Sequence, residues 1–415
     1  MKAVNRKNIS ESIVLLPRII VLALLLISFK SVCQEYIPYG VERQMPVFLD
    51  SMTSRLTYPM AWENAGFSDF SQWRDSARVV LTKSMMTPPP SPSDYAAEVI
   101  YEEQRNGYVA KIVQLNLSGW TRVNVYLLVP NGKGSHPGVV LFHDHGGHFL
   151  IGKEKMIRPI IKTELSDKGK GNIIYNKSDT LIVNDANRWS EQCYGGQYFG
   201  DYLAQQGYAV VCGDALFWGE RGRKEGEDKR KLSEFAGNLM GIGYCMSGIT
   251  TFEDSYLSEW FSSLPEVDSE RIASCGFSMG AYRAWMLSAA SDVVKASINI
   301  CWMTTTKNQF SWQYGRENGG YANTLPTIRY YMDHPHVASI AAPKPTLFIN
   351  GETDKLFKIP GVQSAYETMR IAWEAAGIPE NLETEIWPMP HWCGPEVQAR
   401  AVEFLDKHFK ANSSN

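Results

Sequence analysis

The sequence predicts an α/β fold in which one mostly parallel β-sheet of about eight strands carries helices on both faces. Beyond residue 100, short apolar runs alternate with segments of helical periodicity, as in a parallel sheet covered by its crossover helices. Most of these runs are apolar throughout, which is typical of strands buried on both faces. With 415 residues, 44% of them hydrophobic, the chain can form one large domain with extensions.

The order of the expected elements indicates the topology. The first two strands follow each other directly, as antiparallel neighbours do, and helices separate most later strands. The expected strands are Tyr108–Leu115, Arg122–Val129, Gly138–Phe142, Tyr208–Gly213, Arg271–Gly276, Lys295–Ile300, Thr346–Asn350 and Glu383–Trp387. The expected helices are Gln197–Gln206, Phe252–Ser263, Ala281–Ala290, Gln363–Ala376 and Glu396–Lys410. Two long connections, 150–193 and 302–340, leave the carboxyl ends of strands and are candidates for a lid and a substrate wall.

Residues 1–33 are expected to be a signal peptide, which predicts an exported, periplasmic protein without a stable membrane span after cleavage. A basic start precedes the apolar run Ile19–Phe29, which is too short to span a bilayer comfortably. An uncleaved membrane anchor and a lipid on Cys33, as in a surface lipoprotein, are the alternatives. The segment holds five of the 41 basic and one of the 44 acidic residues, so 36 and 43 remain, a net charge of −7. A nucleic-acid partner is therefore not expected.

Residues 34–100 are expected to form an extension that packs on the main domain, residues 101–412. The extension is rich in aromatic residues and contains Thr87–Pro92, whose prolines favour a stiff, extended backbone. Six cysteines follow position 33 without a close CxxC pair. This spacing favours buried free thiols, although an exported protein could also hold a disulfide.

A serine on a tight turn is the first candidate catalytic residue. The segment 276–280 (GFSMG) matches the G-x-S-x-G pattern and lies between an expected strand and an expected helix. Small neighbours allow a sharp turn, and the start of the helix offers positive charge to a developing anion. A serine that merely caps a helix is the alternative, but the strand–turn–helix context favours Ser278 as a nucleophile.

Chain order points to the partners of this serine. Asp354 follows an expected apolar strand, and His391 lies just after a proline behind the last expected strand, where a stiff loop would position a base. The order serine, aspartate, histidine is the one that hydrolases with a G-x-S-x-G turn use. We therefore expect His391 to be the base and Asp354 the acid behind it, with Glu352 as the rival for the acid.

The segment 143–147 (HDHGG) ends the third expected strand. Its position makes the backbone amide of His145, together with that of Met279, a candidate oxyanion hole. The two glycines would let a substrate approach the backbone closely. The clustered histidines and aspartate also allow a metal site, but a serine triad needs none, and neither a metal nor a cofactor is expected.

These motifs resemble those of dienelactone-hydrolase-like and acetyl-xylan-esterase-like α/β hydrolases, especially the exported group of polysaccharide-degrading bacteria. The similarity rests on the following segments: HDHGG (143–147), Asp214 with GERG (219–222), LPEVD (264–268) before the strand that leads into the serine turn, GFSMG (276–280), GETD (351–354) and MPHW (389–392). It implies an α/β-hydrolase fold, a Ser-His-Asp triad and esters of xylan-like glycans or pectin as substrates. Asp144 departs from the family, which usually has glycine after the histidine.

Other side chains near the expected site suggest how a substrate could bind. Loop 220–231 has six basic and four acidic residues, and Arg221 or Arg223 could pair with a uronate carboxylate. A solvated loop of mixed charge is the alternative. The aromatic faces of Trp218, Trp302 and Trp392 could stack on sugar rings or pack in the core.

The sequence thus predicts a serine carboxylic-ester hydrolase that uses an acyl-enzyme. Its expected partner is a carbohydrate ester, either an acetyl ester or a methyl ester of a uronate in a plant-type polysaccharide or oligosaccharide. A peptidase or a lipase-like hydrolase is the alternative among enzymes. A non-catalytic glycan-binding protein on a hydrolase scaffold is the alternative from another class.

Overall fold

The computed structural model describes residues 48–161, 177–222, 229–310 and 320–410. In these ranges nine strands form one sheet in the order β1-β2-β3-β5-β4-β6-β7-β8-β9. The first three pairings, β1 with β2, β2 with β3 and β3 with β5, are antiparallel, and all later ones are parallel. The strands are β1 (Glu98–Arg105), β2 (Tyr108–Asn116), β3 (Arg122–Pro130), β4 (His136–Phe142), β5 (Ala209–Gly213), β6 (Val267–Phe277), β7 (Ala296–Ile300), β8 (Thr346–Gly351) and β9 (Leu382–Trp387).

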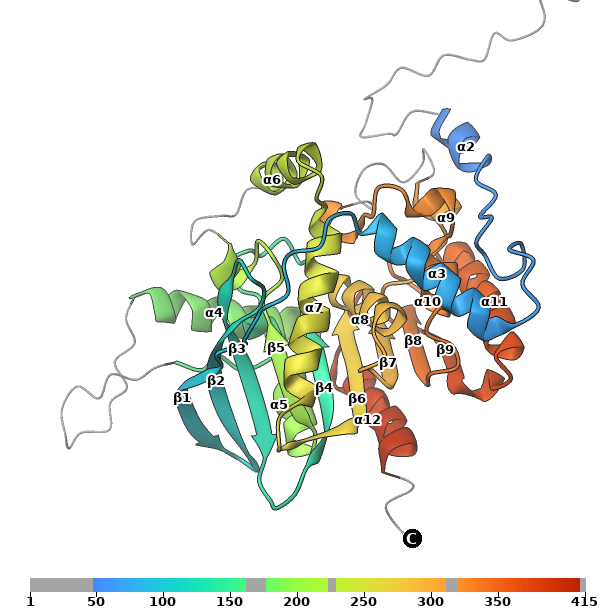
Figure 1. The fold of residues 1–415 in the computed structure, drawn as a ribbon. Helices are drawn as coiled ribbons and strands as arrows, with labels where there is room; N and C mark the ends of the chain where they lie inside the picture. Colours follow the sequence, from blue (N-terminus) through green and yellow to red (C-terminus); the bar gives the residue numbers. More distant parts are fainter. Residues whose placement is uncertain (1–47, 162–176, 223–228, 311–319, 411–415) are drawn as a thin grey trace, which may run out of the picture.

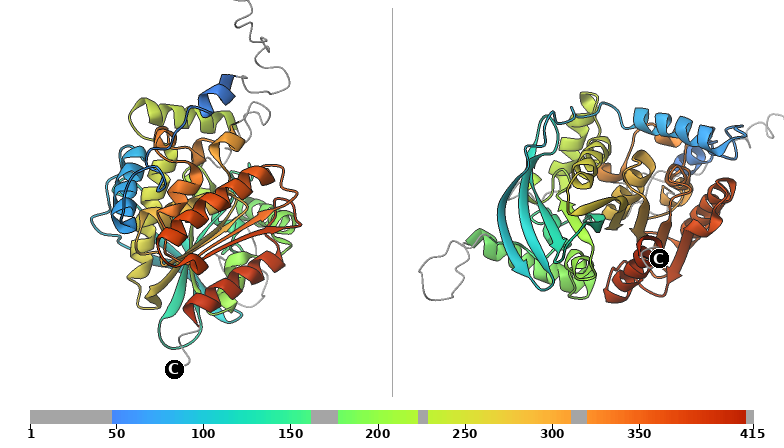
Figure 2. Two further views of the ribbon diagram at one scale, coloured as in Figure 1. Left: turned by 90° about the vertical axis from the view of Figure 1, so that its right-hand side faces the viewer. Right: turned by 60° about the horizontal axis from the view of Figure 1, so that its bottom comes forward.

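Helices cover both faces of this sheet (Figures 1 and 2). Helices α5 and α12 pack on one face, and α7, α8 and α11 pack on the other. The helices are α2 (Phe48–Thr53), α3 (Phe70–Ser84), α4 (Lys177–Tyr194), α5 (Phe199–Gln205), α6 (Lys229–Gly241), α7 (Met246–Ser262), α8 (Met279–Ala290), α9 (Thr306–Gln309), α10 (His334–Ser339), α11 (Ile359–Ala375) and α12 (Pro395–Phe409). Short 3-10 turns lie at Lys153–Lys155, Gly219–Arg221, Tyr321–Asn323, Ile328–Tyr330 and Pro379–Asn381. The expected mostly parallel sheet flanked by helices is confirmed.

The strand β1 was not expected from the sequence. It begins at Glu98, so the expected boundary at residue 100 falls inside a strand that belongs to the sheet. In the sequence EVIYEEQR, five of the eight residues are charged or polar, so the segment does not form an apolar run. An edge strand with one neighbour needs no such run, which is why the apolar pattern does not reveal it.

The described part of the extension also contains a regular helix. Helix α3 begins after Asp69, whose carboxylate accepts from the amide of Gln72 at 2.8 Å, as an N-cap does. Trp73, Ala77 and Leu81 recur every four residues, and all three are buried in a cluster that includes α8. The extension between residues 70 and 84 is therefore helical rather than irregular, and it packs on the helical layer of the sheet.

The two long connections likewise contain helices. Helix α4 occupies the end of the 150–193 connection, and α9 and α10 lie within 302–340. Residues 1–47, with the expected signal peptide, lie outside the described residues. Within the described ranges, no helix is both long enough and apolar enough to cross a membrane.

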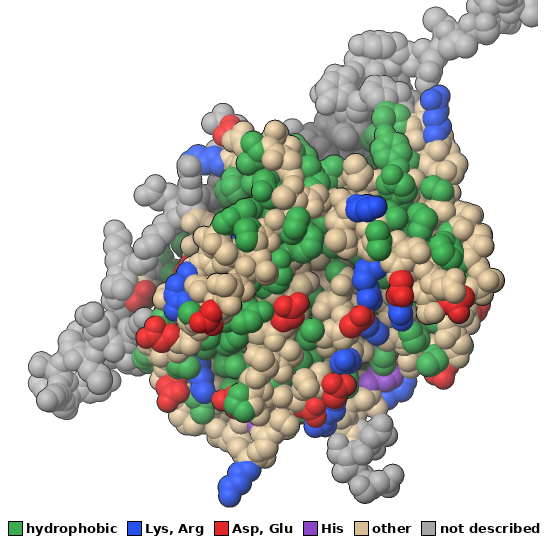
Figure 3. All heavy atoms as spheres, viewed as in Figure 1, with side chains coloured by type: hydrophobic (Ala, Val, Ile, Leu, Met, Phe, Trp, Pro, Cys, Tyr) green, Lys and Arg blue, Asp and Glu red, His purple; other side chains and the backbone are tan. Residues whose placement is uncertain are grey.

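The carboxyl ends of the parallel strands lie at the upper edge of the sheet in Figure 1, toward α6 and α9. Figure 3, drawn from the same side, shows apolar side chains gathered over the upper part of the visible surface, while most charged side chains lie lower. Several large apolar side chains of the described residues are strongly exposed, among them Trp120 (55%), Ile242 (71%) and Tyr330 (71%). Ligands of open α/β sheets bind at this edge.

Candidate active site

Ser278 lies on the turn between β6 and α8, in a conformation that side chains rarely adopt. Its φ is +56° and its ψ −123°, and its amide donates to the carbonyl oxygen of Ile300 at 2.8 Å. Glycines make this turn possible. A Cβ on Gly276 would come within 2.3 Å of the Gly280 backbone, and one on Gly280 within 2.0 Å of the Phe142 carbonyl oxygen. The sheet, the helix and the glycines together hold the serine in a strained turn.

His391 links Ser278 to Asp354. Its Nε2 atom lies 2.8 Å from Ser278 Oγ, and its Nδ1 atom lies 2.7 Å from Asp354 Oδ2. The Asp354 carboxylate is buried, and its other oxygen accepts from the amide of Leu356 at 2.8 Å. Glu352, the rival for the acid, is exposed on the same turn. In this arrangement Nδ1–H donates to the carboxylate, and Nε2 can accept the serine proton.

The backbones of the two loops after β8 and β9 are joined to each other. The amides of Glu352 and Thr353 donate to the carbonyl oxygens of Trp387 and Met389, at 2.7 and 3.1 Å. Gly351 permits this close approach, because a Cβ there would come within 2.4 Å of the Met389 carbonyl oxygen. The position of the acid relative to the base is thus fixed by main-chain contacts and does not depend on the two side chains alone.

The residues proposed for the oxyanion hole belong to two segments that touch. Met279 is the first residue of α8, so its amide has no partner within the helix. His145 lies three residues after Phe142, the last residue of β4. The close packing of Gly280 against the Phe142 carbonyl brings the start of α8 to the end of β4. The two amides therefore come from neighbouring segments beside Ser278.

Buried polar groups hold the loop that contains His145. The Lys155 ammonium donates to the carbonyl oxygens of Asp144 and His145, each at 3.0 Å. The Asp144 carboxylate accepts from the Trp189 indole N–H at 3.1 Å and from the Tyr194 hydroxyl at 2.6 Å. Asp144 thus anchors this loop to helix α4.

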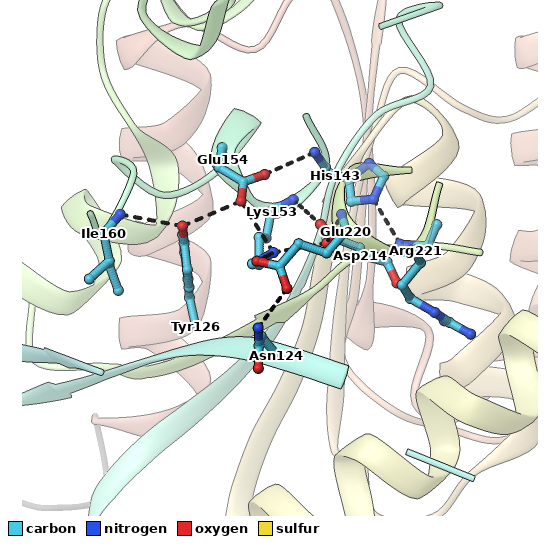
Figure 4. Close-up of polar contacts among 11 residues, drawn as sticks. Asn124, Tyr126, His143, Lys153, Glu154, Ile160, Asp214, Glu220 and Arg221 are labelled. Atoms are coloured by element: carbon cyan, nitrogen blue, oxygen red, sulfur yellow. Dashed lines mark hydrogen bonds and ion pairs between the residues drawn. The ribbon is translucent and has the colours of Figure 1, made fainter. Parts of the chain in front are cut away.

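A second buried network joins the loops that follow β4 and β5 (Figure 4). The fully buried Lys153 ammonium lies 2.8 Å from Asp214 and 3.2 Å from both Glu154 and Glu220. Burial alone would lower the pKa of Lys153, but these three carboxylates outweigh it and raise the pKa well above its usual value. Asn124 on β3 donates to Glu220 at 2.7 Å. The network joins Asp214 to the GERG segment, because Lys153 contacts both Asp214 and Glu220.

The structure corrects the expectation for Arg221. Its side chain is only 7% exposed, and its guanidinium pairs with the buried Glu253 carboxylate at 2.6 Å. The same carboxylate accepts from the hydroxyls of Ser118 and Thr121 in the turn between β2 and β3. Arg221 is therefore part of the interior, because a buried carboxylate needs a positive partner, and it is not open to a substrate. Arg223 lies outside the described residues.

The tryptophans expected near the site are mainly packed. Trp218 is fully buried, and its indole N–H donates to the His145 carbonyl oxygen at 3.1 Å. Trp302 is 2% exposed, with ring centroids of Tyr282 and Phe357 at 4.9 and 5.3 Å. Trp392 is half-buried. The first two rings thus support the surroundings of the site and offer no open face to a sugar.

The arrangement of the histidine, cysteine and carboxylate side chains gives little support to a metal site. The two ring nitrogens of His143 are bonded to the Asp144 carbonyl oxygen and the Ala215 amide, and burial lowers the pKa of this histidine strongly. Among the described residues, the ligand atoms that converge within 4.8 Å belong to Cys301, Asp354 and His391. Burial and the Asp354 charge raise the pKa of the Cys301 thiol to about 12, and the His391 and Asp354 side chains are already hydrogen-bonded to each other.

The fold and this geometry define the class of protein. An eight-stranded hydrolase-type sheet with one added edge strand carries a serine on a strained turn, hydrogen-bonded to a histidine and through it to a buried aspartate. The chain belongs to the Abhydrolase family, whose model matches residues 30–404.

Comparison with known proteins agrees with this assignment. The chain is 23% identical over 314 residues to the Bacillus subtilis (strain 168) protein named "Putative hydrolase YtaP", covering 75% of this chain and 92% of the relative. A crystal structure described as that of a putative acetyl xylan esterase from Bacteroides fragilis NCTC 9343 has a TM-score of 0.63 and 18% identity, over 82% and 81% of the two chains. The glucuronoyl esterase from Solibacter usitatus has a TM-score of 0.58 and 14% identity, over 84% and 94%.

Proposed function

We propose that this protein is a serine hydrolase of carbohydrate carboxylic esters, in which Ser278 is the nucleophile, His391 the base and Asp354 the acid behind it. The observation that carries this proposal is the hydrogen-bonded chain from Ser278 Oγ through the imidazole to the buried Asp354 carboxylate. Such a chain orients a histidine, fixes its tautomer and stabilises the cation that forms when it takes the serine proton.

The proposed reaction has two steps. His391 Nε2 takes the Ser278 proton as Oγ attacks the ester carbonyl carbon, and the amides of His145 and Met279 donate to the resulting oxyanion. The ester C–O bond then breaks, His391 returns the proton to the leaving alcohol, and an acyl-serine remains. Water, deprotonated by His391, attacks the acyl group, releases the acid and restores Ser278.

The choice of carbohydrate esters is supported by the structures that the fold resembles, whose names include a "putative acetyl xylan esterase" and a glucuronoyl esterase. At identities of 18% and 14%, these likenesses indicate fold, and the substrate class is part of the proposal. Acetyl esters of xylan-like glycans and methyl esters of uronates in pectin are the two substrates to test. Export to the periplasm, expected from residues 1–33, belongs to the same proposal.

The test is to incubate the purified chain with acetylated xylan and with methyl-esterified pectin and to measure acetate and methanol. Release of either product supports the proposal and identifies the ester. Ser278→Ala should reduce the rate by several orders of magnitude, on the scale of a lost triad member. Ser262→Ala, on a hydroxyl that only bonds the carbonyl oxygen of Glu259, is the matched control. A Ser278→Ala protein that keeps most of its esterase activity would contradict the assignment.

A further inference from the structure

A pocket of about 440 Å³ opens beside the HDHGG segment, between the loop after β4 and helix α4. Its size is within the range of sites for small molecules. Helix α4 contributes one face to it: Leu181, Asn184, Asp185 and Arg188 are spaced three and four residues apart and so lie on the same side of the helix. The loop contributes His148 and the buried Phe149, among others.

The polar groups of the pocket are arranged around one buried carboxylate. Asp185, with 10% of its side chain exposed, pairs with the guanidinium of Arg188 and lies 3.4 Å from His148 Nδ1. The Arg188 side chain is 67% exposed, and Asn184 is exposed beside it. The pocket thus combines an acceptor held in place by burial with amide and guanidinium donors that reach solvent.

The pocket is connected to the candidate oxyanion loop by packing. The His148 ring packs on Trp189 at a centroid distance of 4.5 Å, and Trp189 in turn donates to the Asp144 carboxylate. Phe149 belongs to the same buried cluster as Met279, the residue after Ser278. A ligand held in the pocket would therefore lie next to the loop that carries His145.

We propose that this pocket binds a sugar unit of the substrate and so selects glycan esters over simple esters. This inference rests on the proposed ester hydrolysis. Sugar hydroxyls both donate and accept, and Asp185, Asn184 and Arg188 supply both kinds of partner. The C–H faces of a sugar need apolar contact, which the exposed Leu181 side chain provides. Because the Asp185 charge is balanced by Arg188, the pocket does not repel acidic glycans.

The test compares the ratio of kcat/KM for an acetylated xylo-oligosaccharide, or a methyl-esterified oligogalacturonide, to kcat/KM for p-nitrophenyl acetate. In the double variant Asn184→Ala/Arg188→Ala this ratio should fall about tenfold or more, because one or two hydrogen bonds to the ligand are lost. Most of the fall should come from a higher KM for the glycan ester. Asn187→Ala, on the same helix but not lining the pocket, is the matched control and should keep the ratio. An unchanged ratio in the double variant overturns the inference.

A binding measurement keeps this inference separate from the proposed function. Titration of Ser278→Ala protein with the same oligosaccharides should give binding heat, which the added Asn184→Ala/Arg188→Ala changes should weaken about tenfold. Equal affinity with and without these changes contradicts the pocket assignment, even if the esterase is active. If p-nitrophenyl acetate hydrolysis does not depend on Ser278, the proposed function itself fails, whatever the binding data give.

Discussion

Gly280 lies so close to Phe142 that a Cβ on the glycine would come within 2.0 Å of the phenylalanine carbonyl oxygen. The obstacle is backbone at the end of β4, which cannot turn away as a flexible side chain can. This contact sets the distance between the start of α8 and the loop that holds His145. The position of the candidate oxyanion hole relative to Ser278 thus depends on the absence of a side chain at residue 280.

Gly280→Ala should therefore impair both folding and activity. We expect a loss of ~1–3 kcal/mol in the free energy of unfolding, as for overpacked cores, and a lower kcat because the two amides move apart. Urea denaturation and ester hydrolysis measure the two effects. Gly237→Ala on α6, where a Cβ would meet nothing within 4 Å, should be neutral or slightly stabilising. A Gly280→Ala protein with wild-type stability would refute the packing argument.

The two acids of the GETD turn offer a direct comparison. Asp354→Asn should reduce kcat by roughly three to four orders of magnitude, because the amide no longer holds the imidazole in its productive tautomer. Glu352→Gln changes an exposed carboxylate two residues away and should leave kcat near that of the natural chain. Steady-state kinetics on any ester that the protein hydrolyses will distinguish them. The opposite order of effects would move the acid to Glu352.

Lys155 is expected to position the loop that carries His145. Lys155→Met removes one donor from each of the Asp144 and His145 carbonyl oxygens, which keep their bonds to His143 and Trp218, at a cost of about 0.5–1.5 kcal/mol per hydrogen bond. If the lysine positions the oxyanion donor, kcat falls more than KM rises, since the oxyanion forms only in the transition state. Lys407→Met, at an exposed ion pair, is the control. A Lys155→Met enzyme with unchanged kcat, assayed below its melting temperature, would make the lysine purely structural.

Lys344 should make stability depend on pH. Burial lowers its pKa from 10.5 to about 7 in the folded protein, and its ammonium donates to the carbonyl oxygens of Ser288 and Ser291. Between these two values the unfolded chain binds the proton and the folded chain releases it, so the free energy of unfolding should rise with pH in this window. Lys344→Met should remove that rise, and the exposed Lys83→Met should retain it. Denaturant titrations at pH 6.5 to 9.5 measure the slopes; equal slopes in all three proteins would contradict the shift.

The elements that the sequence predicted well are those with a strong local signal. All eight expected strands occur. Strands β5, β7 and β8 are fully buried runs, which give the strongest signal, whereas β9 is only partly buried along its length. Helices α4 and α6 were not predicted, since they lie at the surface among polar connections. Five of the six described cysteines are buried, and all six are free thiols, as favoured from their spacing.

The candidate catalytic residues could likewise be predicted from strong local signals in the sequence. Ser278, Asp354 and His391 each lie within four residues of the end of a strand, in a fixed chain order, so their meeting point could be inferred without knowing the packing. Side chains expected to bind substrate had no comparable signal. The charged loop around Arg221 gives no indication of its partner, which is Glu253 on a distant helix.

The sequence by itself therefore determined the family fold, the order of the strands along the chain and the three residues at their ends, because apolar periodicity and glycine-dependent turns are local properties. Only the tertiary structure decided which of the candidate substrate-binding side chains are buried and which other side chains line a pocket. It buried Arg221, Trp218 and Trp302 and placed Asn184 and Arg188 at a pocket, since burial and charge pairing depend on which distant segments the fold brings together.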